Sequence, residues 1–267
     1  MVFLMSDPTH PAEIFVSSID GSDEKQVTEL NKLFLEEIQL QEMEHFTFPS
    51  FDDVTVHVWI MKLLDFEPGK KYPMILRIHG GPHAMYGWVF RERQQILPTA
   101  GYIVLMIDPR GSPEYGQDFS DGSVQDWGRG DYKDLMVGFD YALANFDFID
   151  EGRMGVAGGS YGGYLTNWVI TQTDRFKAAV SSVSISNIFS MYGNSIKWIT
   201  IEHEFGGALW DEKVRKLALE RSPALYLDRV KNSDSVSPWR GRLYLSCHSS
   251  RGDVPRIKTD GCRDSNG

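Results

Sequence analysis

The chain contains the stretch Gly158-Gly159-Ser160-Tyr161-Gly162-Gly163. Before it, residues 153–157 form a short apolar segment that predicts a strand, and after it residues 164–170 predict a helix. A strand, a tight Gly-x-Ser-x-Gly turn and a helix together put a serine on a sharp bend with its hydroxyl pointing outward. Glycines are needed beside this serine, because only residues without a Cβ let the backbone fold that tightly.

This arrangement is typical of the nucleophile elbow of α/β-hydrolases, with Ser160 as catalytic nucleophile and Gly158 and Gly162 as elbow glycines. The helix that follows points its N-terminus at the serine. Its first free N–H group, on Tyr161, is therefore predicted to hold a developing oxyanion. The alternative interpretation is a structural turn, because a Gly/Ser-rich surface turn can match the motif by chance.

A second glycine-rich stretch, His79-Gly80-Gly81-Pro82, follows the apolar segment 73–78. An acyl-transfer serine needs a second oxyanion donor, which this architecture takes from a loop after an earlier strand. Small residues let a backbone N–H approach the substrate carbonyl, and we predict that the N–H of Gly81 is this donor. One such donor is worth roughly 10²–10³ in rate. A plain turn at the strand end is the alternative.

Three histidines invite functional interpretations that the pattern does not favour. In this architecture the general base follows the nucleophile, in the order Ser, Asp, His. Because His79 and His83 precede Ser160, we predict that they shape the loop. In Glu202-His203-Glu204, three adjacent polar residues cannot all face one ion. We therefore predict a solvated segment there and no metal site.

The length, composition and net charge of the chain narrow the class of protein. At 267 residues, with 42% hydrophobic and 24% charged residues, the chain can form one large domain or two small ones. A net charge of -10 argues against nucleic-acid binding. Without an apolar run of about 18 residues or a basic start typical of a signal peptide, we expect a cytoplasmic protein with no membrane partner. Cys247 and Cys262 form no metal or redox spacing, so no cofactor is expected. Homo-oligomerisation is left open.

Strands and helices are expected to alternate along the chain. Patterns of apolar residues predict strands at 12–16, 54–61, 73–78, 102–107, 153–157 and 176–183, and helices at 88–99, 131–146 and 164–170. A second strand segment is expected at 26–30, forming a hairpin, and residues 31–50 look polar and irregular. This alternation predicts an α/β fold with a mostly parallel sheet covered on both faces.

Several motifs resemble the prolyl oligopeptidase family of serine peptidases, most closely its acylaminoacyl-peptidase branch. They occur in family order between residues 8 and 231 and include the segments 78–83, 108–112, 126–128 and 158–164. The resemblance implies an α/β-hydrolase domain that cleaves short peptides through an acyl-enzyme on Ser160. It also implies a preceding β-propeller, whose last blade the opening residues resemble. Asp53 stands where the family usually has glycine, and Asp108 where it often has asparagine.

The resemblance divides the chain into three parts: a blade remnant and linker (1–50), an incomplete hydrolase domain (51–231) and an aberrant tail (232–267). The family's acid and base should follow residue 231, in a strand ending in His-Gly-x-x-Asp and in a later loop with a histidine. Neither motif is present. Asp234 and His248 have the right order, but the sequence around them predicts no buried strand that would position them.

Back-translating 232–267 with synonymous codons and reading one base later can yield an apolar strand, His-Gly-x-x-Asp and an amphipathic helix. We therefore hypothesise a shifted reading frame near Lys231, with the C-terminal part of the hydrolase domain missing. On this hypothesis the chain is a serine peptidase whose own activity depends on an absent base. The alternatives are a non-catalytic fragment and a carboxylesterase of the same fold.

Overall fold

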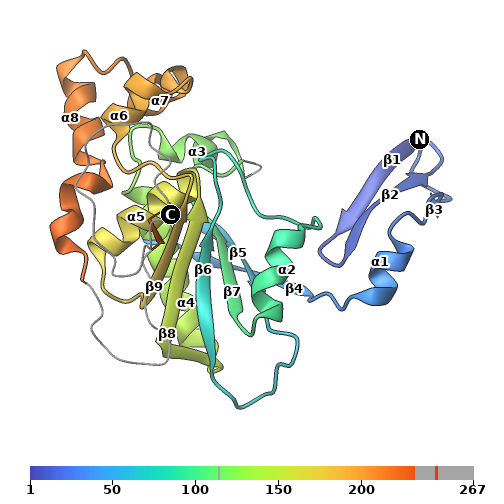
Figure 1. The fold of residues 1–267 in the computed structure, drawn as a ribbon. Coiled ribbons are helices and arrows are strands. Elements are labelled where there is room, and N and C mark those ends of the chain that lie inside the picture. Colours follow the sequence, from blue (N-terminus) through green and yellow to red (C-terminus); the bar gives the residue numbers. More distant parts are fainter. Residues whose placement is uncertain (114, 232–243, 246–267) are drawn as a thin grey trace, which may run out of the picture.

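A computed structural model describes residues 1–113, 115–231 and 244–245. Within this part, the main feature is a seven-stranded sheet with strand order β10-β9-β8-β6-β7-β5-β4 (Figure 1). The strands are β4 (Met43–Pro49), β5 (Thr55–Met61), β6 (Tyr72–Ile78), β7 (Ile103–Asp108), β8 (Ile149–Gly159), β9 (Ala178–Ser182) and β10 (Tyr244–Leu245). Neighbours from β10 to β7 are parallel, whereas β5 is antiparallel to both β7 and β4. The predicted α/β class with a mostly parallel sheet is confirmed.

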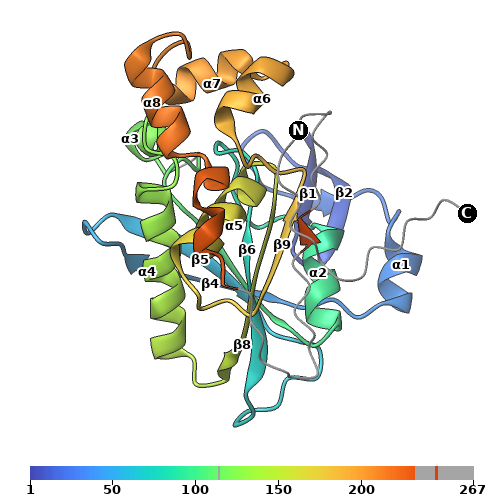
Figure 2. The ribbon, with the colours of Figure 1, turned by 60° about the vertical axis from the view of Figure 1, so that its left-hand side comes forward.

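Helices cover both faces of this sheet. They are α2 (Glu92–Thr99), α3 (Gln117–Ser120), α4 (Gly130–Asn145), α5 (Tyr161–Gln172), α6 (Ile188–Asn194), α7 (Trp198–Phe205), α8 (Glu212–Glu220) and the 3-10 helices η1 (Asp121–Ser123) and η2 (Pro223–Arg229). Figure 2 shows α4 and α2 on opposite sides of the sheet, with α6, α7 and α8 gathered at one end. The strand predictions from β5 to β9 and the helix predictions for α2, α4 and α5 agree with these bounds to within a few residues.

The core is divided by the sheet into two clusters. Alternate residues of β5 point to opposite faces, because the side-chain period of a strand is two. Val58 and Ile60 pack in the cluster that contains Phe139 of α4. Trp59 packs in the other cluster, against which Leu97 of α2 lies. Burial on both faces explains why these strands read as nearly continuous apolar runs.

The first residues form a separate three-stranded sheet of order β1-β2-β3, followed by α1. Its elements are β1 (Val2–Asp7), β2 (His10–Val16), β3 (Lys25–Gln26) and α1 (Lys32–Glu37). Figure 1 shows this sheet beside α2. The Gln95 side chain of α2 connects the two parts, because its Nε2 donates to the Pro8 carbonyl at 3.1 Å and its Oε1 accepts from the Gln41 N–H at 2.8 Å.

The structure differs from the predictions mainly in residues 26–50. The strand expected over 26–30 comprises only Lys25–Gln26, and the irregular stretch expected over 31–50 was wrong, since it contains α1 and β4. β4 shows little alternation because it lies at the edge of the sheet and buries only Met43 and Phe48. It pairs with β5 over its whole length, so this strand before residue 50 belongs to the main sheet.

Two other strands were not predicted. β1 pairs with β2 in the N-terminal sheet. β10 pairs with β9 in the main sheet, although no strand was expected after residue 231. The remaining predictions for 232–243 and 246–267, including Asp234, His248 and both cysteines, lie outside the described residues.

Candidate active site

Ser160 lies between the end of β8 and the start of α5. Its backbone has φ of 57° and ψ of -120°, a region that non-glycine residues rarely adopt. Two hydrogen bonds hold this bend: the Ser160 N–H donates to the Ser182 carbonyl at 3.0 Å, and the Tyr164 N–H donates to the Ser160 carbonyl at 2.9 Å. Contacts with β9 and with the first turn of α5 therefore hold Ser160 in this strained conformation.

The glycines on either side of Ser160 are required by close backbone contacts. A Cβ on Gly158 would lie 2.2 Å from the Gly162 carbonyl oxygen, and a Cβ on Gly162 would lie 2.2 Å from the Ile78 carbonyl oxygen. Neither backbone oxygen can move without disturbing the elbow or β6. The predicted reason for glycine at these positions thus agrees with the geometry.

The glycine-rich loop after β6 lies directly against the elbow. β6 and β8 are parallel neighbours, with Ile78 opposite Gly158, so the segments that follow both strands meet at one edge of the sheet. A Cβ on Gly80 would lie 3.5 Å from the Ser160 Cβ. Gly81 follows with φ of 135°, and a Cβ there would lie 2.6 Å from the His83 nitrogen. The structure therefore brings together the two motifs that the sequence analysis selected.

The side chain of Tyr161, the residue that follows Ser160, is buried. It is the first residue of α5, so helix geometry gives its N–H no acceptor within the helix. Its ring lies 4.7 Å from that of Trp127, and its hydroxyl donates to a carboxylate oxygen of Asp131. Burial raises the pKa of Asp131 to about 6, although hydrogen bonds from Tyr161, Gly128 and Tyr132 act against the shift.

Asp131 was missed as a site residue in the sequence analysis. In the sequence it only marks the start of the helix predicted over 131–146. Its contact with Tyr161 spans 30 positions of sequence, and no local pattern links the two residues. The available signal was the position of Asp131 four residues before Leu135, which puts an acidic residue on the apolar face of the predicted helix.

His79 has both ring nitrogens engaged within its own loop and the next one. Nδ1 lies 2.6 Å from the Gly80 carbonyl oxygen, and Nε2 lies 3.1 Å from the Ser112 hydroxyl oxygen. Burial lowers the pKa of His79, although Asp108 lies 3.7 Å from the ring and acts in the opposite direction. These contacts agree with a loop-shaping residue.

Ser160 is an exposed residue, and within the described part of the chain its hydroxyl makes no hydrogen bond. No described histidine therefore contacts it as a general base. The acid and base expected after residue 231 fall outside the described residues. The described site thus consists of a strained serine, a glycine-rich loop beside it and the N-terminus of α5.

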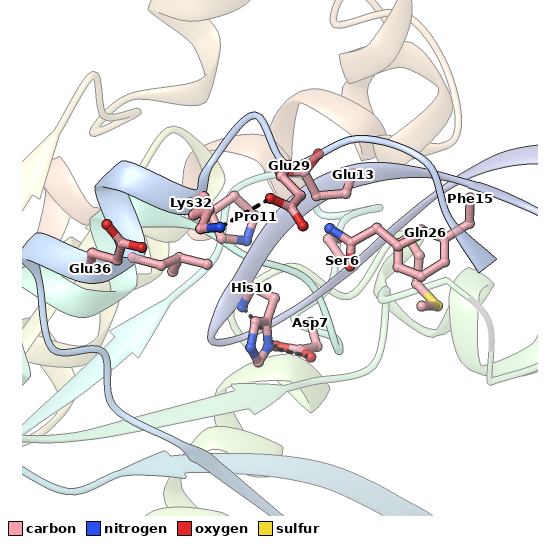
Figure 3. A pocket seen from close by; sticks show the side chains of 12 residues that line it. Ser6, Asp7, His10, Pro11, Glu13, Phe15, Gln26, Glu29, Lys32 and Glu36 are labelled. Atoms are coloured by element: carbon pink, nitrogen blue, oxygen red, sulfur yellow. Dashed lines mark hydrogen bonds and ion pairs between the residues drawn. The ribbon is translucent and has the colours of Figure 1, made fainter.

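A separate hollow lies on the N-terminal sheet and α1 (Figure 3). Residues between Met5 and Glu36 line it, so it contains no part of the elbow. In Figure 3 dashed lines join His10 to Asp7, at 2.9 Å, and Lys32 to Glu29, at 3.3 Å. This hollow is therefore not an extension of the serine site.

Among the described helices, none is long and apolar enough to cross a membrane.

Comparison with known proteins identifies relatives of the chain. The model of the prolyl oligopeptidase family matches residues 88–245. The chain is 40% identical over 233 residues to the uncharacterized peptidase YuxL of Bacillus subtilis, covering 84% of this chain and 35% of that protein. It is 35% identical over 175 residues to dipeptidyl-peptidase 5 of Schizosaccharomyces pombe, covering 64% of this chain and 26% of that protein. The chain thus spans about a third of these relatives or less.

Solved structures agree with this result. Acylaminoacyl peptidase of Pyrococcus horikoshii superposes with a TM-score of 0.79 at 32% identity, covering 86% of this chain and 36% of that one. A puromycin-hydrolyzing peptidase of Mycobacterium tuberculosis superposes with a TM-score of 0.73 at 23% identity, covering 86% and 36%, which shows the shared fold alone. The described fold is therefore that of the α/β part of acylaminoacyl peptidase, and the chain belongs to the prolyl oligopeptidase family.

Proposed function

We propose that this chain carries the catalytic serine of a peptidase that hydrolyses short peptides through an acyl-enzyme on Ser160. The observation that supports the proposal most strongly is the strained backbone of Ser160 at the β8–α5 junction, beside the His79-Gly80-Gly81 loop. Relatives named dipeptidyl-peptidase 5 and acylaminoacyl peptidase support the substrate class.

In this proposal the Ser160 hydroxyl attacks the peptide carbonyl carbon and gives up its proton to a general base. The carbonyl oxygen becomes an oxyanion that accepts hydrogen bonds from the backbone N–H groups of Gly81 and Tyr161. Collapse of this intermediate breaks the C–N bond, the leaving amine takes a proton from the base, and the acyl group stays on Ser160. Water then releases it by the same steps in reverse.

The base is the part of this mechanism that the described residues do not supply. A serine site without its base retains roughly 10³–10⁴-fold rate enhancement over water from the oxyanion donors and binding. We propose that the natural reading frame after Lys231 encodes the acid and the base. By the same family resemblance, the β1-β2-β3 sheet is the last blade of a propeller that precedes the hydrolase domain.

Labelling with a fluorophosphonate tests the proposal, with the modified residue mapped by peptide mass spectrometry. We expect modification at Ser160, its loss in Ser160→Ala, and full labelling in the matched variant Ser195→Ala, which changes a partly exposed serine before α7. Turnover is then compared among an N-acylaminoacyl anilide, a dipeptidyl anilide and a simple acyl ester. Ester cleavage alone would favour a carboxylesterase, and no labelling would favour a non-catalytic fragment.

A further inference from the structure

Three side chains that are far apart in the sequence meet beside the glycine-rich loop. They are His83, two residues after Gly81, and the adjacent pair His203 and Glu204 at the end of α7. One ligand atom from each of the three lies within 4.8 Å of the others. The Glu204 Oε1 atom is 2.9 Å from His83 Nε2 and 3.2 Å from His203 Nδ1.

The tautomer of His83 follows from its other contact. His83 Nδ1 lies 2.9 Å from the Gly111 carbonyl oxygen, which can only accept a hydrogen bond. Nδ1 therefore carries the proton, and a neutral ring directs its Nε2 lone pair at a carboxylate oxygen of Glu204. The close approach of this Nε2 to a carboxylate oxygen needs a cation between the two atoms, either a proton, which makes the ring an imidazolium, or a metal ion. A ligating histidine whose second nitrogen donates to a backbone carbonyl is the usual arrangement in metal sites.

Glu204 is held in a fixed position for such a role. Its side chain is 1% exposed. Its Oε2 atom accepts from the Trp127 indole N–H at 2.8 Å and from the Ser123 hydroxyl at 3.3 Å, which leaves Oε1 facing the two imidazoles. Within the described residues, the ion pairs of Glu204 involve these two histidines and neither lysine nor arginine. A buried carboxylate without a permanent cation is costly, and a metal ion would compensate its charge.

We infer that His83, His203 and Glu204 form a binding site for a transition-metal ion of the Zn²⁺ class. Bonds of about 2.0–2.1 Å in tetrahedral geometry place ligand atoms about 3.3 Å apart. The two distances from Glu204 Oε1 to the imidazole nitrogens, 2.9 and 3.2 Å, are close to this value, and the two imidazole nitrogens lie within 4.8 Å of each other. The side chains of His83 and His203 are 38% and 65% exposed, so the ion enters from solvent and keeps an open position for water.

A bound ion would join the glycine-rich loop to α7, because His83 follows Gly81 and Pro82 directly. This site does not depend on the chemistry of Ser160. It also differs from the sequence-based expectation for Glu202-His203-Glu204. The prediction of a solvated segment was wrong for Glu204, which is buried. The third ligand comes from a loop 120 positions earlier in the chain, so the three adjacent residues do not need to share one ion.

Metal titration of the full 267-residue chain tests the inference. The chain carries Cys247→Ser and Cys262→Ser, so that neither thiol can bind the ion. Zn²⁺ affinity is measured at neutral pH by competition with a chromophoric chelator, and Co²⁺ binding by its visible absorption. We expect one equivalent of either metal and a Co²⁺ spectrum typical of tetrahedral nitrogen and oxygen ligands.

The variants His203→Gln and His83→Gln are expected to weaken Zn²⁺ binding at least about tenfold. The matched variant His10→Gln, which changes an exposed histidine of the N-terminal sheet, should bind like the parent chain. Since His203 is exposed, its replacement leaves the core intact, and thermal unfolding without metal checks this. Absence of binding by the parent chain, or equal affinity in His203→Gln, would overturn the inference.

Discussion

The hydroxyl of Tyr161 donates a hydrogen bond to the buried carboxylate of Asp131. Tyr161 directly follows Ser160 and begins α5, whereas Asp131 lies in the first turn of α4. The same carboxylate accepts from the N–H groups of Gly128 and Tyr132 at 3.0 and 2.6 Å. The start of one helix is thus tied to the start of another, and the proposed oxyanion donor is positioned by a residue that does not touch substrate.

The first prediction concerns the pH dependence of stability. The pKa of Asp131 is raised from 3.8 to about 6 by burial, so between these values the folded chain holds a proton that the unfolded chain has lost. This group therefore contributes a free energy of unfolding that falls by about 1.4 kcal/mol per pH unit as pH rises through the range, roughly 3 kcal/mol in all. Asp131→Asn should remove that slope.

The measurement is urea denaturation of the parent chain and Asp131→Asn at several pH values from about 4 to 7. A lost hydrogen bond in the variant shifts its stability by a constant amount at every pH. The free energy of unfolding of the parent chain minus that of the variant should therefore decrease steadily as pH rises. Two curves that stay parallel would show that Asp131 titrates normally in the folded protein.

The second prediction concerns the elbow glycines. Gly158→Ala places a Cβ 2.2 Å from a backbone oxygen and should lower the free energy of unfolding by about 3 kcal/mol. Gly193→Ala is the matched control, because Gly193 lies in α6 and an added Cβ there would meet no other atom within 4 Å. This control should gain about 0.5–1 kcal/mol from helix propensity. Urea denaturation of both variants gives the comparison, and similar effects at the two sites would contradict the described elbow.

The third prediction concerns Asp53, at which the chain departs from the family pattern. Asp53, where the family usually has glycine, has φ of 65° in the turn between β4 and β5. Its carboxylate makes no hydrogen bond within the described part of the chain. Asp53→Gly should therefore be more stable than Asp53→Ala by about 1 kcal/mol, because a Cβ is strained in the left-handed region.

The control for this comparison is Lys216 in α8, an exposed position with helical backbone. There the order should be reversed, with the alanine variant about 1 kcal/mol more stable than the glycine variant. Thermal or urea unfolding of the four variants measures both differences. An Asp53 pair that follows the helical order would be inconsistent with a left-handed residue in this turn.

The fourth prediction concerns the coding sequence. We expect the DNA across codons 225–267, read one base later after about codon 231, to encode an apolar strand, His-Gly-x-x-Asp and then a loop with a histidine. Direct sequencing of the gene and its downstream region checks this. Stop codons or unrelated residues in that frame would remove the hypothesis, and the non-catalytic interpretation would then be favoured.

Local sequence patterns predicted much of the fold and the centre of the site. Within a single segment, the spacing of apolar residues shows which side chains are buried. Such spacing identified the alternating residues of β5, the apolar runs of β6 and β7 and the 3.6-residue period of α4. The elbow was equally readable, because the demand for glycine at Gly158 and Gly162 arises from backbone contacts around one turn and from the adjacent strand.

Tertiary structure decided what depends on partners distant in the chain. β4 exists as a strand because β5 pairs with it, and β10 because β9 does. The pairing of Asp131 with Tyr161 and the meeting of His83 with Glu204 join residues separated by 30 and 121 positions. Such contacts leave no periodic trace in sequence, because each needs the sheet to bring separate helix ends and loops together before the side chains can meet.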